Sequence, residues 1–497
     1  MLENTRRNVA CYISALILAG CASNDPYHKL NVGPGNCDPS LEDSDESIDC
    51  RNSYLQHYEH HTIAVAEYTE RGNHFSDESL DNILNYIDER SSDKGVVTLV
   101  FVHGWNHNSE ETEERTDSNL ADFKNVIAEI AKDASNQEDN FNLNGRALVG
   151  LYVGWRGRSL LFPKSATYWE RKAVAQNFGN NGLARLILEL DRIDSKNPDN
   201  VLVTIGHSFG GAAVLTAVTE PLLSRVLEPS GTVQKTDPRC EGISCGIGDG
   251  IYLINPAIEA NQVLPLIEAT LDKKYSTKQP PLLVSISSEA DWANKILFPL
   301  GQTAGLLATS RQAPLNRSYF RIEGDSDPIE LREEALDSTA VGNFAPFLTH
   351  RIDVPDLSAW CRDIRDQVTT DPLYLDSNPF SRCEDYGAAN ACGPKLFPKG
   401  FDTTPRGALV SGRDQNSPLY FIRTNKHFMG GHNDIFNEHV VAFLSAQLKQ
   451  GLISSINNNS YSNDLYNDPD IFQENYQEAL EFSCKLNFGK GIVDTAR

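Results

Sequence analysis

VLVTIGHSFGGAAV, residues 201–214, carries the most informative pattern in the chain. Its first five residues form an apolar, β-branched run that is typical of a strand buried on both faces. Gly206 and Gly210 then lie two residues on either side of Ser208. A tight turn from strand to helix strains the backbone of its central residue and needs small neighbours. The segment therefore predicts a serine hydroxyl raised above the edge of a sheet, beside the N-terminus of a helix.

Short apolar runs of the same kind recur along the chain and alternate with amphipathic segments. This alternation is typical of an α/β fold, in which a mostly parallel central sheet has helices on both faces. We expect strands at residues 62–68, 96–102, 147–153, 251–254, 282–286 and 419–422, and helices at 76–90, 120–130, 167–193 and 437–449.

The composition is that of a large globular protein with an acidic surface. The chain has 497 residues, of which 40% are hydrophobic and 23% charged, and its net charge is −24. A chain of this length can bury a large core, which excludes disorder throughout. The acidity argues against nucleic acid as a partner, because a phosphate backbone attracts Lys and Arg.

The N-terminus has the pattern of an export signal. A basic start at Arg6 and Arg7 precedes an apolar run over residues 9–19, which is too short to span a membrane stably. The end of this run, Leu-Ala-Gly-Cys at residues 18–21, resembles the lipobox of bacterial lipoproteins. The resemblance implies cleavage before Cys21, a lipid anchor on that cysteine and, because Ala22 follows, a place at the outer membrane. The alternative is an ordinary signal peptide in which Cys21 has no such role.

The remaining cysteines fit an exported protein with disulfides. Once residues 1–20 are removed and Cys21 carries lipid, eight cysteines remain, and an even number in an exported chain favours pairing. Their connectivity does not follow from the sequence alone. Short loops favour the pairs Cys37–Cys50, Cys240–Cys245 and Cys383–Cys392, which leaves Cys361–Cys484.

These signals predict one large domain that is flanked by shorter terminal segments and interrupted by insertions. We expect a signal peptide at 1–20, a tether at 21–60, an α/β domain at 61–449 with insertions at about 218–249 and 310–416, and a tail at 450–497. Three histidines, His57, His60 and His61, fall in the tether. Because they lack a framework of cysteines or carboxylates, we interpret them as solvated residues rather than metal ligands.

The motif around Ser208 resembles the nucleophile elbow of the α/β-hydrolase family, and the resemblance extends over roughly residues 62–449. It implies a serine nucleophile whose oxyanion hole uses two backbone N–H groups. One comes from Phe209, directly after the serine. The other comes from the loop Val-His-Gly-Trp-Asn at 102–106, where Trp105 or its neighbour Gly104 is the candidate donor. His103 in this loop is interpreted as structural.

The resemblance also orders the charge partners as serine, then acid, then histidine along the chain. The acid is expected after the strand at 282–286, where Asp291 is favoured, Glu289 is the alternative and Glu259 remains a further candidate. The base is expected after the last strand, and His432 is favoured because a flexible Gly-Gly pair precedes it. His427 is the runner-up, and His439 falls within the expected last helix.

The sequence therefore predicts a lipid-anchored serine hydrolase that cleaves acyl esters and needs no metal or other cofactor. The expected partners are a small acyl-ester or lipid substrate and the membrane, through the anchor. The oligomeric state stays open, as does the alternative of a non-catalytic cell-envelope interaction protein on the same scaffold. An apolar stretch at 293–308 is interpreted as a core helix in preference to an acyl-binding wall.

Overall fold

The computed structural model describes most of the expected α/β domain. The described residues are 25–31, 37, 50–111, 119–135, 143–157, 168–227, 243–276, 279–306, 314–322, 328–354, 395–398, 408–410 and 416–456. The expected signal peptide, Cys21 and the tail beyond residue 456 lie outside them. In the described part of the chain, no helix combines the length and the apolar character that a membrane crossing requires.

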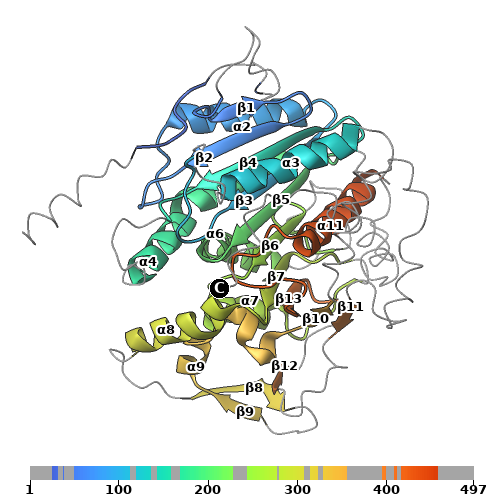
Figure 1. The fold of residues 1–497 in the computed structure, drawn as a ribbon. Helices are drawn as coiled ribbons and strands as arrows, with labels where there is room; N and C mark the ends of the chain where they lie inside the picture. Colours follow the sequence, from blue (N-terminus) through green and yellow to red (C-terminus); the bar gives the residue numbers. More distant parts are fainter. Residues whose placement is uncertain are drawn as a thin grey trace, which may run out of the picture.

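A ten-stranded sheet organises the fold, in the order β1-β2-β4-β3-β5-β6-β7-β13-β10-β11 (Figure 1). The strands from β2 to β10 in this order pair in parallel, while β1 and β11 pair antiparallel at the two edges. The bounds are β1 (Leu55–His57), β2 (Thr62–Glu67), β4 (Ala147–Gly154), β3 (Val96–Val102), β5 (Val201–His207), β6 (Gly250–Ile254), β7 (Leu283–Ser288), β13 (Leu419–Thr424), β10 (His350–Asp353) and β11 (Lys395–Pro398).

Helices cover both faces of this sheet, because the central strands are apolar on both sides. In β3, Val96, Val100 and Val102 belong to one buried cluster, whereas Val97 and Leu99 belong to the other. The period of two along a strand sends successive side chains to opposite faces. The first cluster is covered by α2 (Asp77–Ser91), α4 (Tyr168–Phe178), α5 (Ala184–Asp194), α6 (Phe209–Leu227) and α7 (Ala260–Thr270), and the second by α3 (Asn119–Ser135) and α11 (Glu438–Ile456). The predicted mostly parallel α/β fold is thus confirmed.

The long helix expected at 167–193 is interrupted by a π-helical turn, Gly179–Leu183, which joins α4 to α5. A side chain at Gly179 would meet the backbone of Ala213 in α6, so the helix passes α6 at close range there. The hydrophobic periodicity predicted the helix but gave no sign of the extra residue in this turn.

The two expected insertions have different boundaries in the structure. The helix α6 continues through Pro221 to Leu227, because Leu222 and Val226 remain buried against the core, so residues 218–227 are not an excursion. Within 310–416, β10 and β11 join the main sheet. A separate three-stranded sheet is formed there by β12 (Ala408–Val410), β8 (Leu315–Ile322) and β9 (Pro328–Leu331).

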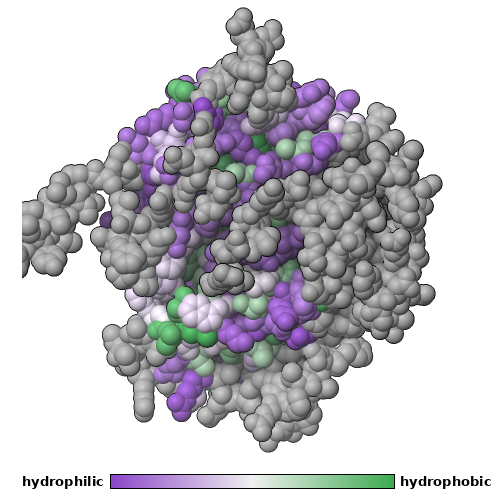
Figure 2. All heavy atoms as spheres, viewed as in Figure 1, coloured by the Kyte–Doolittle hydropathy of each residue, from purple (hydrophilic) through white to green (hydrophobic). Residues whose placement is uncertain are grey.

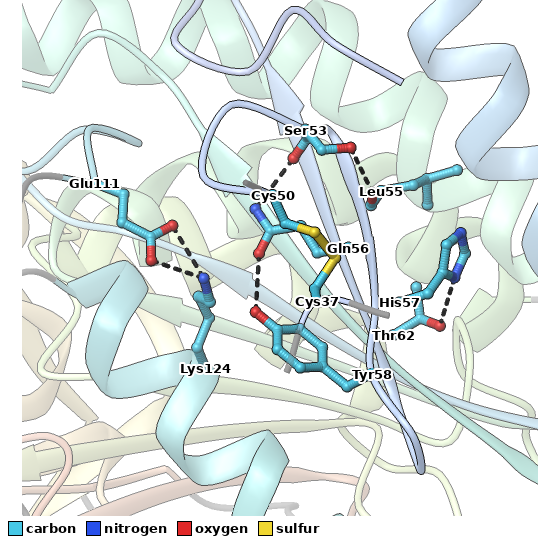
Figure 3. Close-up of a disulfide and its surroundings, with 10 residues drawn as sticks. All are labelled: Cys37, Cys50, Ser53, Leu55, Gln56, His57, Tyr58, Thr62, Glu111 and Lys124. Carbon is cyan, nitrogen blue, oxygen red and sulfur yellow. Dashed lines mark hydrogen bonds and ion pairs between the residues drawn. A yellow bond between two sulfur atoms is a disulfide. The ribbon is translucent and has the colours of Figure 1, made fainter. Parts of the chain in front are cut away.

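A disulfide links Cys37 to Cys50 beside the edge strand β1, as the loop length predicted (Figure 3). The hydroxyl of Ser53 donates to the carbonyl of Leu55, and the side-chain amide of Gln56 donates to the carbonyl of Ser53 at 3.1 Å. Residues 50–60 of the expected tether are therefore part of the fold. Cys245 is also disulfide-bonded, and the other cysteines lie outside the described residues.

Replacing both cysteines of this disulfide, Cys37→Ser with Cys50→Ser, should lower the free energy of unfolding by about 3 kcal/mol, because the bond closes a short loop in the unfolded chain. Urea denaturation followed by circular dichroism measures the change. The strand β1 lies at the sheet edge, far along the strand order from β5, so the reactivity of Ser208 should be retained. An unchanged urea midpoint would contradict a stabilising role for the bond.

Candidate active site

Ser208 lies in a strained turn between β5 and α6. Its φ angle is +54°, in the left-handed region that a residue with a side chain rarely adopts. The glycines of the motif permit the turn. A side chain at Gly206 would come within 2.8 Å of the Cα of Gly211, and one at Gly210 would collide with the carbonyl oxygens of Val102 and His103. The start of α6 is thus packed directly on the end of β3.

Three side chains from distant parts of the chain form a hydrogen-bonded row at this turn. The Nε2 atom of His432 lies 2.8 Å from the Oγ of Ser208. The Nδ1 atom of the same ring lies 2.9 Å from the Oδ2 of Asp291. These residues follow β5, β13 and β7, whose carboxyl ends meet at one edge of the parallel sheet. The structure therefore brings together the residues that the sequence favoured as nucleophile, base and acid.

The loop that carries His432 is held by its backbone. The carbonyl oxygen of His432 accepts a hydrogen bond from Nε2 of His207 at 2.9 Å and another from the amide of Asn255 at 3.0 Å. The same amide also donates to the carbonyl of Gly431 at 3.0 Å. Asn255 lies directly after β6 with a φ of +43°, a conformation that asparagine tolerates better than most residues. The position of the imidazole therefore depends on the two strands nearest the serine.

Asp291 is fixed in its turn by Asn294. The backbone N–H of Asn294 donates to Oδ1 of the carboxylate at 3.0 Å, and its side-chain amide donates to Oδ2 at 2.8 Å. That amide also donates to the carbonyl of Asn255 at 2.9 Å. The carboxylate is only 2% exposed, so these donors replace water as its hydrogen-bond partners.

The alternative acids and bases lie in other surroundings. Glu289 is partly exposed and pairs with Arg351 at 3.4 Å. Glu259 is buried in an ion pair with Lys172, and burial lowers the pKa of that lysine to about 8. His427 is exposed, while His439 is buried in α11 with its ring 5.9 Å from that of Phe428. In the described part of the chain, no hydrogen bond joins any of these four side chains to the Ser208 hydroxyl, which pairs with His432.

The loop after β3 lies against the serine, where the oxyanion donors were predicted. A side chain at Gly104 would come within 3.0 Å of the Cβ of Ser208. None of the described residues accepts a hydrogen bond from the backbone N–H groups of Gly104, Trp105 or Phe209. These groups are therefore free to donate to an oxygen bound at the serine.

Phe209, the residue after the serine, belongs to a cluster of three packed aromatic rings that we call the aromatic wall. The ring of Phe209 lies 6.1 Å from that of Trp105 and 5.2 Å from that of Tyr168, measured between centroids. The Trp105 and Tyr168 rings meet edge to face at 6.0 Å. Burial raises the pKa of the Tyr168 hydroxyl, so that group stays neutral at physiological pH. The aromatic wall is consequently apolar and uncharged.

His103 holds the loop rather than the serine. Its Nδ1–H donates to the carbonyl of Gly104 at 2.9 Å, and its Nε2 accepts from the backbone N–H of Trp155 at 3.1 Å. The ring stacks on that of Trp155, with centroids 5.6 Å apart. It is fully buried, and desolvation lowers its pKa to about 3. Both ring nitrogens are thus engaged in the neutral form.

The sequence did not predict the roles of His207, Asn255 and Asn294 in holding the row. His207 was visible as part of the elbow motif, and Asn255 as a polar residue at a strand end, but their contacts with His432 depend on folding. Among the described residues, no group of three or more His, Cys, Asp or Glu side chains is arranged to hold a metal ion. No family model matches this chain, and neither a curated protein nor a solved structure matches it.

The burial of His103 predicts a loss of stability in acid. Folding lowers the pKa of His103 below its unfolded value near 6.5. The neutral ring therefore contributes fully to the free energy of unfolding above that pH. This contribution is lost as the pH falls, because the unfolded chain takes up the proton more readily. Between pH 6 and pH 5 the loss should be about 1 kcal/mol. Urea titrations at both pH values measure it. His103→Gln, which keeps a donor and an acceptor, should lose less over this interval; parallel pH curves would contradict the assignment.

Proposed function

We propose that this chain is a serine hydrolase on an α/β-hydrolase scaffold, which cleaves acyl esters through an acyl-enzyme on Ser208. The observation that carries the proposal is the row Ser208–His432–Asp291, whose hydrogen bonds of 2.8 and 2.9 Å connect a strained serine to a buried carboxylate. A serine hydroxyl is a weak nucleophile at neutral pH and needs such a base.

The mechanism follows from the donors and acceptors. His432 accepts the proton of Ser208 at Nε2 while Oγ attacks the ester carbonyl. Its Nδ1–H donates to Asp291, which fixes the tautomer and stabilises the imidazolium. The carbonyl oxygen becomes an oxyanion, and the N–H of Phe209 together with that of Trp105 or Gly104 donates to it. The imidazolium then protonates the departing alcohol, and a water molecule, activated by the same base, releases the acid.

The surroundings of the row favour catalysis over a purely structural role. Ser208 is held at a φ of +54°, and such strain persists only where the packing around it enforces the conformation. His207 and Asn255 donate hydrogen bonds to the backbone carbonyl of His432. Asn294 donates one to the carboxylate of Asp291. A scaffold kept only for interaction would not need this arrangement. The non-catalytic alternative nevertheless predicts a distinct result, which is a serine that no active-site reagent labels.

We place this activity in the cell envelope. The proposal rests on the sequence of residues 1–21, whose basic start, apolar run and terminal cysteine favour export, cleavage before Cys21 and anchoring by lipid at the outer membrane. The proposed partners are an acyl-ester or lipid substrate and the membrane, and the proposed chemistry requires neither metal nor cofactor.

Purified protein should react with a fluorophosphonate probe, which modifies serines that are activated by a neighbouring base. Ser208→Ala should abolish labelling. In-gel fluorescence measures the reaction, and Ser53→Ala, which removes a buried hydroxyl bonded to a backbone carbonyl, is the matched control that should label like wild type. Equal labelling of wild type and Ser208→Ala, or labelling of neither, would refute the proposed function.

Asp291→Asn should lower kcat for a short acyl ester by about 10⁴-fold, because an amide in place of the carboxylate favours the wrong imidazole tautomer. Glu289→Gln changes a nearby carboxylate in the same way and should lower it less than threefold, since Glu289 faces Arg351. Steady-state kinetics compares the two variants. Similar, mild losses in both would contradict the assignment of Asp291 as the acid.

A further inference from the structure

The helix that follows Asp291 has its apolar side chains on the outside. This helical segment comprises a π-helical turn, Ala293–Leu297, with Trp292 as its N-cap, and α8 (Phe298–Leu306). Its exposed side chains include Trp292 at 56%, Ile296 at 41% and Leu300 at 64%. With Leu297, which is 42% exposed, they form a surface that we call the apolar face. The core helix expected at 293–308 is therefore wrong for these residues, which are at the surface.

The opposite side of the same segment is buried and largely polar. Asn294 is 4% exposed and binds Asp291, as described above. Gln302 is 6% exposed and donates to the carboxylate of Glu259. Between them, Phe298 packs in the core with Lys172 5.8 Å above its ring. This distribution reverses the usual pattern, in which a surface helix turns its apolar stripe inward and its polar stripe to water.

The contacts of the buried polar side chains explain their position, whereas the exposed apolar side chains need a separate explanation. The inward polar residues position the acid and close a buried ion pair, so their contacts account for that face. Water offers no stabilisation to the outward Trp292, Ile296 and Leu300, and a contiguous exposed apolar surface marks a place where another apolar surface binds. Figure 2 shows hydrophobic residues gathered on the surface where α8 lies in Figure 1.

The apolar face lies on a segment that contacts the surroundings of Ser208 at two points. Trp292 directly follows Asp291 in the chain. In α8, a side chain at Gly301 would come within 3.0 Å of the ring of Tyr168, so this helix lies against the aromatic wall. Tyr168 in turn packs on Phe209, the residue after the serine. Packed contacts through Tyr168 and Phe209 thus connect α8, which carries the apolar face, to the residue that follows Ser208.

Charge selects among the surfaces that could bind there. Lys295 is the single charged residue between Trp292 and Leu306, whereas the whole chain carries a net charge of −24. An anionic lipid surface would be repelled by the chain, and one lysine near such a surface contributes only about 1 kcal/mol. A neutral or zwitterionic surface carries no such penalty.

We propose that the apolar face docks on the neutral surface of aggregated acyl esters, such as a zwitterionic bilayer or an ester droplet, and so delivers acyl chains to Ser208. This inference rests on the proposed function for its substrate, but the docking itself needs no catalysis. It specifies a substrate class, namely neutral lipid esters presented in an aggregate.

Vesicle flotation with the full chain tests the docking directly. The parent carries Cys21→Ser, which removes the predicted lipid anchor, and Ser208→Ala, which prevents turnover. It should bind phosphatidylcholine vesicles, and adding Ile296→Gln and Leu300→Gln should weaken the partition coefficient at least tenfold, because both exposed side chains lose their apolar contact. The control adds Leu188→Gln and Leu227→Gln instead, at residues 40% and 56% exposed on α5 and α6, and should bind like the parent.

Several results would overturn the proposal: binding to anionic vesicles alone, equal binding of the apolar-face variant and the parent, or a parent dimer in solution that the same variant converts to a monomer. The last result would assign the face to a second copy of the chain.

In the active protein, Ile296→Gln with Leu300→Gln should lower turnover of an emulsified triacylglycerol at least tenfold while leaving turnover of p-nitrophenyl acetate within twofold. Loss of fluorophosphonate labelling by wild type would instead refute the proposed function and leave the vesicle result standing.

Discussion

The packing of the first turn of α6 on the end of β3 determines the geometry around Ser208. Gly210 lies so close to the carbonyls of Val102 and His103 that no side chain fits between the two elements. This contact holds Ser208 at its positive φ, because the turn cannot relax without separating the helix from the strand. It also brings Gly104 against the serine, so one contact positions both Ser208 and the loop that carries the proposed oxyanion donors.

Asn255 extends this constraint to the other two members of the row. Its amide donates to the carbonyl of His432, its carbonyl accepts from Asn294 beside Asp291, and its Oδ1 accepts from the backbone of Ser288 at 2.9 Å. The loops that follow β13 and β7, together with the last residue of β7, are thus tied to one residue at the end of β6. Such ties keep His432 and Asp291 within hydrogen-bonding distance although each lies in an irregular segment, where backbone freedom is otherwise greatest.

The parts of this arrangement that depend on local pattern could be predicted from the sequence. The buried strands and the turn at Ser208 follow from β-branched runs and glycine spacing, and the loop position of His432 follows from its place after the last strand. Asn255 and Asn294 could not be assigned, because their roles exist only once distant loops meet. The strand β10 was not predicted, because its four residues include His, Arg and Asp and form no apolar run. The prediction of α8 as a core helix was wrong, because several of its apolar residues face outward.

That misjudgement has a physical explanation which connects the acid to the surface. A helix placed directly after Asp291 has to turn polar groups inward, since the buried carboxylate needs donors such as Asn294 and the ion pair beside it needs Gln302. Because polar residues occupy the inward side, the remaining apolar residues of this helix lie on the outside. The sequence indicates an apolar stretch here, but the buried charge beside it decides which side of the helix lies inside. The same residues that hold the buried Asp291 and Glu259 carboxylates thus determine which side chains of this helix form the exposed apolar face.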